Sequence, residues 1–325
     1  MQPVRWGVLG AAKFAREQMA RAIHAAEGAE LAALATSSVE KAAGFTAFAP
    51  GLTMYSEYDA LLGDPSLDAV YIPLPNHLHV EWALKALEAG KHALVEKPLG
   101  LHASDFDAVI AKRDTSGLLA AEAFMIVFHP QWQRVRALIA DGAIGPLRHV
   151  EPNFTYDNRA DPGNIRNSAA TGGGALPDIG VYTCGAVRFA TGLEPEAVLH
   201  SEITWEEGVD VFSHCSARFP GFTFSGLVSM RMERRQSVTF HGERGLIKLP
   251  CPFNPLGFGA AELRLTTEKN VTRVETWPEA NQYVLQVEAF CRSVREGAPY
   301  PCPLEFSKGT QAMIDAIYDA ALRNG

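Results

Sequence analysis

The first 124 residues alternate short apolar segments with stretches of helical periodicity, and no other feature restricts the fold as strongly. The apolar segments span residues 4–9, 31–35, 69–73, 92–95 and 118–124. Helical patterns span residues 14–27, 39–49, 58–62, 79–89 and 103–116. Strictly alternating strands and helices form a parallel sheet joined by right-handed crossovers. The sequence therefore predicts an α/β protein whose first domain, residues 1–124, is a doubly wound (Rossmann) nucleotide-binding sheet.

The rest of the chain follows a different pattern. A helix at 130–141 precedes long alternating segments rich in β-branched and aromatic residues, and helices at 282–296 and 306–323 come last. The alternating segments span residues 148–156, 196–205, 211–219, 222–231 and 236–241. Strands joined by short turns indicate a large open mixed or antiparallel sheet. Residues 125–325 are therefore predicted to be an α+β domain for substrate binding, whose open sheet face joins a homodimer or homotetramer.

Composition excludes several classes of protein. The length of 325 residues suits two domains, and a net charge of -8 with an isoelectric point near 5.7 disfavours a nucleic-acid partner. No segment approaches the roughly 18 consecutive apolar residues of a membrane span, and no signal segment precedes the first strand. Five scattered cysteines without a C-x-x-C pair indicate free thiols in a reducing cytoplasm. His77 and His79 lie close together but lack further ligands nearby, so no metal site is predicted.

The first strand runs into a loop of small residues that opens a helix. Gly10, Ala12 and Ala15 occupy the three small positions of the dinucleotide fingerprint G-x-G-x-x-G/A. Gly10 permits the tight turn, and Ala12 still lets backbone amides approach a pyrophosphate at the helix amino terminus. Alanine at the second position weakens the match, so a plain strand-to-helix turn is the alternative.

The loop after the second strand indicates which dinucleotide is bound. An NAD enzyme usually carries an acidic residue here, which accepts hydrogen bonds from the ribose 2′-hydroxyl. This chain has three hydroxyl residues, Thr36 to Ser38, with Lys41 nearby. Hydroxyl donors and a cation favour a 2′-phosphate, so we expect NADP. NAD remains the alternative if Glu40 turns toward the ribose.

A lysine stands at the carboxyl end of the fourth apolar segment. Glu96-Lys97-Pro98 follows residues 92–95, and the proline ends the strand ladder because it lacks a backbone donor. A lysine at this position points into the crevice where open α/β sheets bind ligands, and the bond to Pro98 is a candidate for the cis form. A merely solvated Glu-Lys pair before a turn is the alternative.

A glycine-rich segment begins a helix in the second half of the chain. Three glycines at 172–174 precede Pro177, and they allow the backbone to approach a ligand or cofactor edge closely. Asp178 and Tyr182 are four residues apart, so a carboxylate and a phenol project from one helical face. The alternatives are that Asp178 complements the helix dipole and that Tyr182 packs in the core.

Seven motifs occur in an order that is specific in combination. They are Gly10-Ala11-Ala12, residues 71–79, Glu96-Lys97-Pro98, and residues 122–125, 129–132, 164–167 and 172–182. In order and spacing they resemble the glucose-fructose oxidoreductase / inositol dehydrogenase / MocA (Gfo/Idh/MocA) family. The resemblance is strongest to the branch of NADP-dependent D-xylose 1-dehydrogenases and dihydrodiol dehydrogenases, and it covers almost the whole chain. It implies a Rossmann domain, NADP as the cofactor and hydride transfer as the activity.

The resemblance also implies the catalytic residues. Lys97 and Tyr182 are expected to be the catalytic pair, with Asp178 as an acidic partner. Hydride transfer at an alcohol carbon requires a group that takes and returns the hydroxyl proton. A phenol performs this role near neutral pH when a nearby cation favours the phenolate, and Lys97 would supply that cation.

The same resemblance, together with the loops above, assigns the ligand-binding residues. The expected cofactor-binding residues are Gly10, Ala11, Ala12, Lys13, Phe14, Ser37, Ser38, Lys41, Pro73, Leu74, Asn76, His79, Glu96, Lys97, Glu122 and Arg166. The expected substrate-binding residues are Phe154, Tyr156, Arg166, Asp178 and Tyr182, and further candidates for the substrate wall are Phe128, His129 and Trp132.

These observations predict an NADP-dependent dehydrogenase or reductase acting on the CH–OH group of a sugar, polyol or cyclic diol. A 1,5-anhydrofructose reductase-like enzyme is an alternative, although such relatives commonly have histidine at the position of Tyr182. A nucleotide-sensing regulator of the same fold is another, because fold alone does not fix function. Such regulators typically lose the catalytic lysine or its partner, and this chain keeps Lys97, Asp178 and Tyr182.

Overall fold

The chain folds into two compact units, each with its own sheet. This computed structural model describes residues 2–324. The first unit comprises the chain up to Phe128 together with residues 281–308, and the second comprises residues 129–280 together with the chain from Gly309 onward. The predicted domain boundary after residue 124 lies close to the end of the first segment at Phe128. The prediction does not include residues 281–308 in the first unit.

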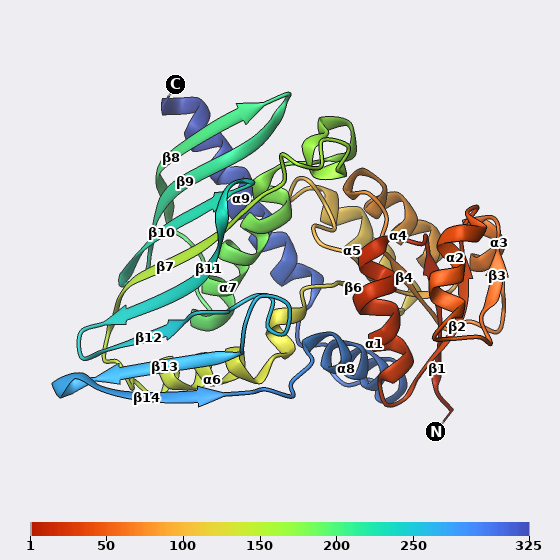
Figure 1. The fold of residues 1–325 in the computed structure, drawn as a ribbon, viewed down its shortest axis with the longest axis horizontal. Helices are drawn as coiled ribbons and strands as arrows, with labels where there is room; N and C mark the ends of the chain where they lie inside the picture. Colours follow the sequence, from red (N-terminus) through yellow and green to blue (C-terminus); the bar gives the residue numbers. More distant parts are fainter. Residues whose placement is uncertain (1, 325) are drawn as a thin grey trace. The chain divides into compact units, whose positions relative to one another are not determined.

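The sheet of the first unit has six strands in the order β3-β2-β1-β4-β5-β6, and its neighbouring strands are parallel. The strands are β1 (Val4–Leu9), β2 (Ala29–Ala35), β3 (Thr53–Tyr55), β4 (Ala69–Ile72), β5 (His92–Val95) and β6 (Ala120–Glu122) (Figure 1). The order reverses at β1, which confirms the predicted doubly wound sheet. Strand β3 was not predicted because it has three residues and is largely exposed.

Helices cover both faces of this sheet. They are α1 (Ala20–Ala25), α2 (Val39–Thr46), α3 (Tyr58–Leu62), α4 (His79–Glu88), α5 (Asp105–Ser116) and α8 (Gln282–Glu296), with shorter turns η1 (Ala15–Met19), η2 (Asn76–Leu78) and η3 (Met125–Phe128). Trp6 of β1 packs on Phe290 of α8, with ring centroids 4.8 Å apart. Leu9 instead shares a buried cluster with Leu61 of α3 and Leu87 of α4. Because side chains alternate along a strand, α8 lies on the opposite face from α3 and α4.

Helix α8 packs in the first unit, although the predicted boundary after residue 124 assigns it to the second domain. Its buried residues include Val287 and Phe290, and Phe290 and its partner Trp6 have no exposed surface. Removing a large aromatic side chain from water contributes up to about 3 kcal/mol, so the first unit gains substantially from this late segment. The amphipathic pattern of residues 282–296 shows that the helix has a buried face but not which sheet that face covers.

The sheet of the second unit has eight strands in the order β14-β13-β12-β11-β7-β10-β9-β8. They are β7 (Leu147–Asp157), β8 (Ala197–Glu206), β9 (Val209–Phe219), β10 (Phe222–Ser229), β11 (Arg231–Gly242), β12 (Gly245–Leu249), β13 (Glu262–Thr267) and β14 (Val271–Thr276) (Figure 1). Strands β7 and β10 pair in parallel and the other pairs are antiparallel. The sheet is therefore mixed, as predicted, and it is wider than predicted by β12, β13 and β14.

One face of the second sheet packs on helices. The helices of this part are α6 (Pro130–Ala140), α7 (Val181–Thr191) and the portion of α9 (Leu304–Asn324) from Gly309 onward. Its short turns are η4 (Ile165–Asn167), η5 (Ala169–Thr171), η6 (Leu176–Gly180) and η7 (Glu268–Asn270). Helix α7 contacts β7 and β10, and Cys215, Ala217 and Phe224 are buried on that side. His214 and Ser216 alternate with them and remain partly exposed. We call the face that carries His214 and Ser216 the outer face.

Two further expectations concern cysteines and membranes. None of the five cysteines of the described chain forms a disulfide, as predicted, and all five are buried: Cys184, Cys215, Cys251, Cys291 and Cys302. Within residues 2–324, none of the helices has the length and apolar character needed to cross a membrane.

Candidate active site

The loop after β1 has the shape that the small-residue pattern predicts. Gly10 has φ +100°, and its amide donates to the carbonyl of Ala35 at 2.9 Å. A Cβ at Gly10 would lie 3.0 Å from Leu74 and 3.3 Å from the hydroxyl of Tyr58, so both conformation and space require glycine. The amide of Arg16 donates to the carbonyl of Ala12 at 3.0 Å, which places the helix start directly after the loop.

The surface of this loop is open to a ligand. Ala11 and Ala12 are partly exposed, and Lys13 and Phe14 are exposed. The helix begins with the π-helical turn η1 rather than with a regular α-turn, a distortion that is frequent at functional sites. Small residues at a helix amino terminus let backbone amides reach a phosphate, so these residues fit a dinucleotide.

The hydroxyl residues after β2 lie at the amino terminus of α2. Ser38 is the N-cap, and its hydroxyl accepts a hydrogen bond from the amide of Lys41 at 3.2 Å. A hydroxyl that accepts in this way keeps its own proton as a donor. Ser37 and Lys41 are exposed beside it. A helix amino terminus, hydroxyl donors and a lysine together form a suitable environment for a phosphate.

Lys97 lies at the carboxyl end of β5 in a shaped turn. The Lys97-Pro98 peptide bond is cis, as predicted. Tyr71 donates its hydroxyl hydrogen bond to Glu96 at 2.5 Å, and the amide of Lys97 donates to the other carboxylate oxygen of Glu96 at 3.2 Å. Burial raises the pKa of Glu96, while the Tyr71 hydrogen bond and the charge of Lys97 act in the opposite direction. Glu96 therefore fixes the backbone from which Lys97 projects.

Two predicted cofactor-binding residues lie beneath this turn instead of at the surface. His79 is fully buried, and its ring nitrogens lie 2.7 Å from the carbonyl oxygens of Pro98 and Leu74. Burial lowers the pKa of His79 to about 4, although the two carbonyl oxygens oppose this shift. Glu122 is also buried and accepts a hydrogen bond from the amide of Leu99 at 2.8 Å. Both residues hold the 97–99 segment in place.

The remaining predicted residues of this unit are close to the same turn. Pro73 is buried and Asn76, partly exposed, begins the 3-10 turn η2 that leads into α4. The strand pairing aligns Ile72 with Val95 and Val95 with Glu122. The ends of β4, β5 and β6 therefore carry the segments that contain Asn76, Lys97 and Glu122.

In the second unit, two of the three glycines lie very close to other parts of the chain. A Cβ at Gly173 would overlap the carbonyl oxygen of Arg166, and a Cβ at Gly174 would overlap the carboxylate of Asp210. The amide of Gly174 donates to the Arg166 carbonyl at 3.0 Å, and the amide of Leu176 donates to Asp210 at 2.7 Å. The glycine segment thus fastens the 164–167 loop to the start of the helix, so a close backbone approach is made within the chain itself.

Asp178 is the centre of a charged cluster. Its carboxylate forms an ion pair with Arg166 Nε at 2.8 Å and accepts a hydrogen bond from the hydroxyl of Tyr156 at 2.6 Å. The charge of Asp178 raises the pKa of Arg166 despite the opposing effect of burial. Burial raises the pKa of Tyr156, and the Asp178 charge adds to this shift. The Asp178 carboxylate therefore does more than interact with the helix dipole, because it has two defined side-chain partners.

Tyr182 follows this cluster in the same helical run. Asp178 lies in the π-helical turn η6 and Tyr182 in the first turn of α7. The Tyr182 ring packs against Phe154, with centroids 5.8 Å apart, and against Phe253, with centroids 5.5 Å apart. Only 6% of Tyr182 is exposed. Tyr182 also interacts electrostatically with Arg166 of the Asp178–Arg166–Tyr156 cluster. All five predicted substrate-binding residues therefore meet within one unit.

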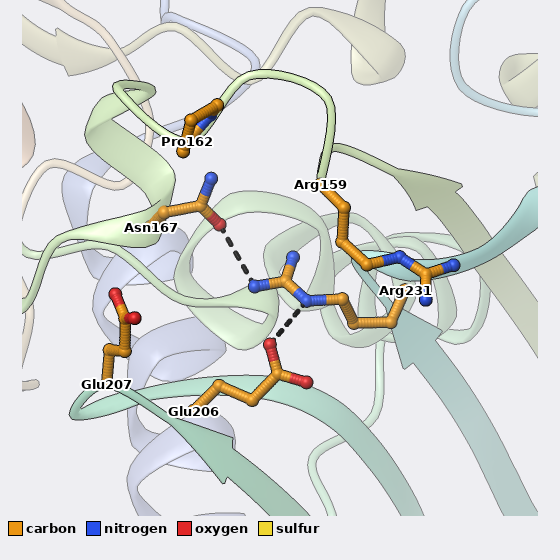
Figure 2. A pocket seen from close by; sticks show the side chains of 6 residues that line it. All are labelled: Arg159, Pro162, Asn167, Glu206, Glu207 and Arg231. Atoms are coloured by element: carbon orange, nitrogen blue, oxygen red, sulfur yellow. Dashed lines mark hydrogen bonds and ion pairs between the residues drawn. The ribbon is translucent and has the colours of Figure 1, made fainter.

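Next to this cluster lies a polar cavity of about 460 Å³. Its lining residues are Arg159, Pro162, Asn167, Glu206, Glu207 and Arg231 (Figure 2). Arg231 stands between Glu206, at 2.6 Å, and Asn167, at 3.3 Å. The positive charge of Arg231 acts against the burial that raises the pKa of Tyr156. This electrostatic interaction connects the cavity to the cluster around Asp178. The cavity can accept a polar substituent of a substrate.

Several site residues have no recognisable signal in the sequence. Phe253 lies in an irregular segment after β12, and Glu206 and Arg231 stand at the ends of strands far from the glycine-rich motif. The predicted wall residues His129 and Trp132 are instead buried at the start of α6, where Trp132 stacks on Phe253 with centroids 6.2 Å apart. Trp132 thereby supports the aromatic wall, and His129 caps the amino terminus of α6.

Comparisons with known proteins agree with these features. The family model for GFO/IDH/MocA, described as an oxidoreductase family with an NAD-binding Rossmann fold, matches residues 4–124, and the C-terminal domain model of that family matches residues 132–248. An uncharacterized oxidoreductase of Rhizobium meliloti, ORF334, is 40% identical over 99% of this chain and 98% of its own length. D-xylose 1-dehydrogenase (NADP(+)) 2 of Haloferax volcanii is 33% identical over 97% of each chain.

A solved structure is similar over almost the entire chain. KijD10, a 3-ketoreductase from Actinomadura kijaniata in complex with NADP and TDP-benzene, has a TM-score of 0.89, with 30% identity over 98% of each chain. Both halves of the sequence thus match models of one family. The chain therefore belongs to the Gfo/Idh/MocA family of oxidoreductases, enzymes with an NAD-binding Rossmann domain.

Proposed function

We propose that this oxidoreductase transfers hydride between NADP(H) and the CH–OH or carbonyl carbon of a sugar, polyol or cyclic diol. Tyr182 is the proton donor and acceptor, assisted by Lys97 and Asp178. The observation that carries the proposal is the held carboxylate of Asp178, which has two ordered partners and begins the helical run that presents Tyr182. A carboxylate so fixed is available to orient a substrate hydroxyl.

The chemistry follows from the groups present. In the oxidative direction the substrate hydroxyl gives its proton to the oxygen of Tyr182 as the carbon loses hydride, and a carbonyl forms. In the reductive direction Tyr182 returns the proton to the alkoxide oxygen. An ammonium group beside a phenol favours the phenolate, and we assign this role to Lys97. When bound, the dinucleotide supplies the hydride acceptor or donor.

The choice of NADP rests on the residues after β2. The amino terminus of α2 offers Ser37, the Ser38 hydroxyl proton and Lys41, and no carboxylate occupies the end of β2. A 2′-phosphate gains from each of these groups, whereas NAD would lack its usual acidic partner. The NADP dependence of the Haloferax volcanii relative agrees with this choice.

The similarity to KijD10 favours a second candidate substrate. That ketoreductase binds TDP-benzene together with NADP, so a nucleotide-linked keto sugar belongs among the substrates to test. The polar cavity beside Asp178 could hold part of such a molecule, but both of its arginines are already paired with carboxylates, Arg231 with Glu206 and Arg159 with Asp157. We therefore place an unlinked sugar or diol first.

The test compares substrates and one tyrosine variant. Purified enzyme would be assayed with NADP and NAD against aldoses including D-xylose, polyols, dihydrodiols, 1,5-anhydrofructose and a dTDP-linked keto sugar. Tyr182→Phe is expected to lower kcat/KM for the best substrate by at least about 100-fold, the usual worth of a positioned acid/base. Tyr300→Phe is the matched control, because the Tyr300 hydroxyl is buried in the first unit at 3.5 Å from Gln286. Unchanged turnover in Tyr182→Phe would contradict the assigned role.

We also infer that the chain assembles as a homodimer or homotetramer through the outer face of the second sheet and resides in the cytoplasm. Support for assembly comes from the width of the sheet and from the partly exposed side chains of His214 and Ser216 on that face. Five buried cysteines that form no disulfide within the described residues agree with a reducing compartment. Size-exclusion chromatography with light scattering tests the first inference, and a monomer at micromolar concentration would contradict it.

A further inference from the structure

Two histidines and a glutamate come together on the outer face of the second sheet, away from the candidate active site. His200 and Glu202 lie on β8, and His214 lies on β9 directly opposite Glu202 in the antiparallel register. Residues two apart on a strand share a face, so all three side chains point the same way. One ligand atom from each residue lies within 4.8 Å of the others.

The arrangement fits the ligand preferences of a divalent transition metal. Imidazole nitrogens and a carboxylate oxygen are typical zinc ligands at about 2.0–2.2 Å, and a tetrahedral ion would bring them to roughly 3.4 Å from one another. Small side-chain rotations would bring ligand atoms that lie within 4.8 Å of one another to this separation. Three protein ligands leave a fourth position for water.

The neighbours of the cluster support ligand binding. The ring of His214 lies 3.3 Å from the hydroxyl of Ser225 on β10, which orients the imidazole as an outer partner often does in metal sites. The rings of His200 and His214 are 6.3 Å apart at 60° to each other, so they are not stacked and both edges remain accessible. Among the residues that the structure describes, no lysine or arginine forms an ion pair with Glu202.

We propose that His200, Glu202 and His214 form a binding site for a divalent transition metal of the zinc type. The metal would lie apart from the hydride-transfer chemistry, because Phe154 and Tyr156 project from the opposite face of the same sheet. It would tie the edge strand β8 to β9, the hairpin that also carries Glu206 of the polar cavity. The sequence alone does not indicate this site, because eleven residues separate Glu202 from His214.

Two other histidines on the outer face provide matched controls. His149 and His241 are cross-strand partners on β7 and β11. His149 is already hydrogen-bonded to the hydroxyl of Thr223 at 2.8 Å, and in the described part of the chain the metal-type cluster includes neither residue. Replacing either one removes an outer-face imidazole without touching the proposed site.

The experiment measures zinc binding to tag-free, chelator-treated, full-length enzyme by calorimetry with zinc chloride, with metal analysis after gel filtration. We expect saturable binding that His214→Ala and Glu202→Ala each weaken by more than about tenfold, since even outer partners of a metal site are worth about that much. His149→Ala and His241→Ala should bind zinc as the wild type does. Circular dichroism shows whether each variant is folded.

Two outcomes would overturn the proposal. One is the absence of saturable zinc binding to the wild-type enzyme, and the other is equal binding by folded His214→Ala and wild type. Turnover is recorded in parallel with and without zinc. Because none of the three ligands belongs to the catalytic set, His214→Ala should keep wild-type kcat/KM, which separates this proposal from the proposed function.

Discussion

His129 provides a quantitative test of how the second unit depends on pH. It is the N-cap of α6, and its Nδ1 accepts a hydrogen bond from the amide of Gln131 at 3.0 Å. The proton of the neutral ring is therefore on Nε2, which is buried without a hydrogen-bond partner among the described residues. Burial lowers the pKa of His129 from 6.5 to about 4. Protonation would place a charge in the core and remove the cap.

The sign and the size of the effect follow by linkage. A folded-state pKa below the unfolded value gives stability that is present above pH 6.5 and lost as the pH falls toward about 4. Each pKa unit corresponds to about 1.4 kcal/mol, so the full contribution is about 3 kcal/mol. Between pH 7 and pH 5 the free energy of unfolding should fall by about 2 kcal/mol on account of His129 alone.

The assay compares the wild type with His129→Asn, because asparagine keeps a capping oxygen but does not titrate. Urea unfolding at pH 7 and pH 5 should show a pH-dependent loss that is about 2 kcal/mol smaller in the variant. Other titrating groups, His79 among them, contribute equally to both proteins. NMR of histidine-labelled protein should show the His129 ring still neutral at pH 5. Equal pH dependence of the two proteins, or a ring that titrates near 6.5, would refute the reasoning.

Three further predictions concern the loops and the cofactor. Gly173→Ala should lower the free energy of unfolding by about 2–3 kcal/mol, because the added Cβ meets a backbone carbonyl. Gly163→Ala is the control, because Gly163 has open space around it, and it should change the free energy of unfolding by less than about 0.5 kcal/mol. Urea unfolding measures both values. Asp178→Asn should lower the pKa of Tyr156, because the charge of Asp178 raises it, and should also lower kcat/KM. Tyrosinate absorbance measures the first effect and steady-state kinetics the second. An unchanged titration of Tyr156 would contradict the first effect. Ser37→Asp should shift the ratio of kcat/KM for NADP over NAD toward NAD by at least about tenfold, and a ratio that does not move would contradict the assigned phosphate position.

The sequence predicts the parallel sheet better than the mixed one. Strands β1 and β5 and helices α3 and α8 have the predicted bounds, because strong apolar runs or clear helical patterns end at turn residues. The predicted strand 222–231 runs past the end of β10 at Ser229, since buried Met230 continues the apolar run into β11. Strands β12 to β14 were not predicted because they lie at the edge of the sheet, and β14 is mostly exposed.

The sequence also predicts only part of the candidate site. Local spacing predicts that Asp178 and Tyr182 share a helical run, but the partners of Asp178 depend on tertiary packing. Arg166 reaches the carboxylate because glycines let its loop approach the helix start, and Tyr156 does so because β7 packs beneath that helix. For His79, the family motif indicates a functional position but does not show that the side chain is fully buried.

The return of residues 281–308 to the first unit has a consequence for synthesis on the ribosome. Trp6 emerges early, yet its partner Phe290 is made almost last, so the first unit stays incomplete until nearly the whole polypeptide has been translated. During that interval one face of the parallel sheet lacks its α8 cover and exposes apolar surface. A gene fragment ending after residue 124 would retain that defect permanently. Expression of the Rossmann half alone should therefore require residues 281–308 in trans or by fusion.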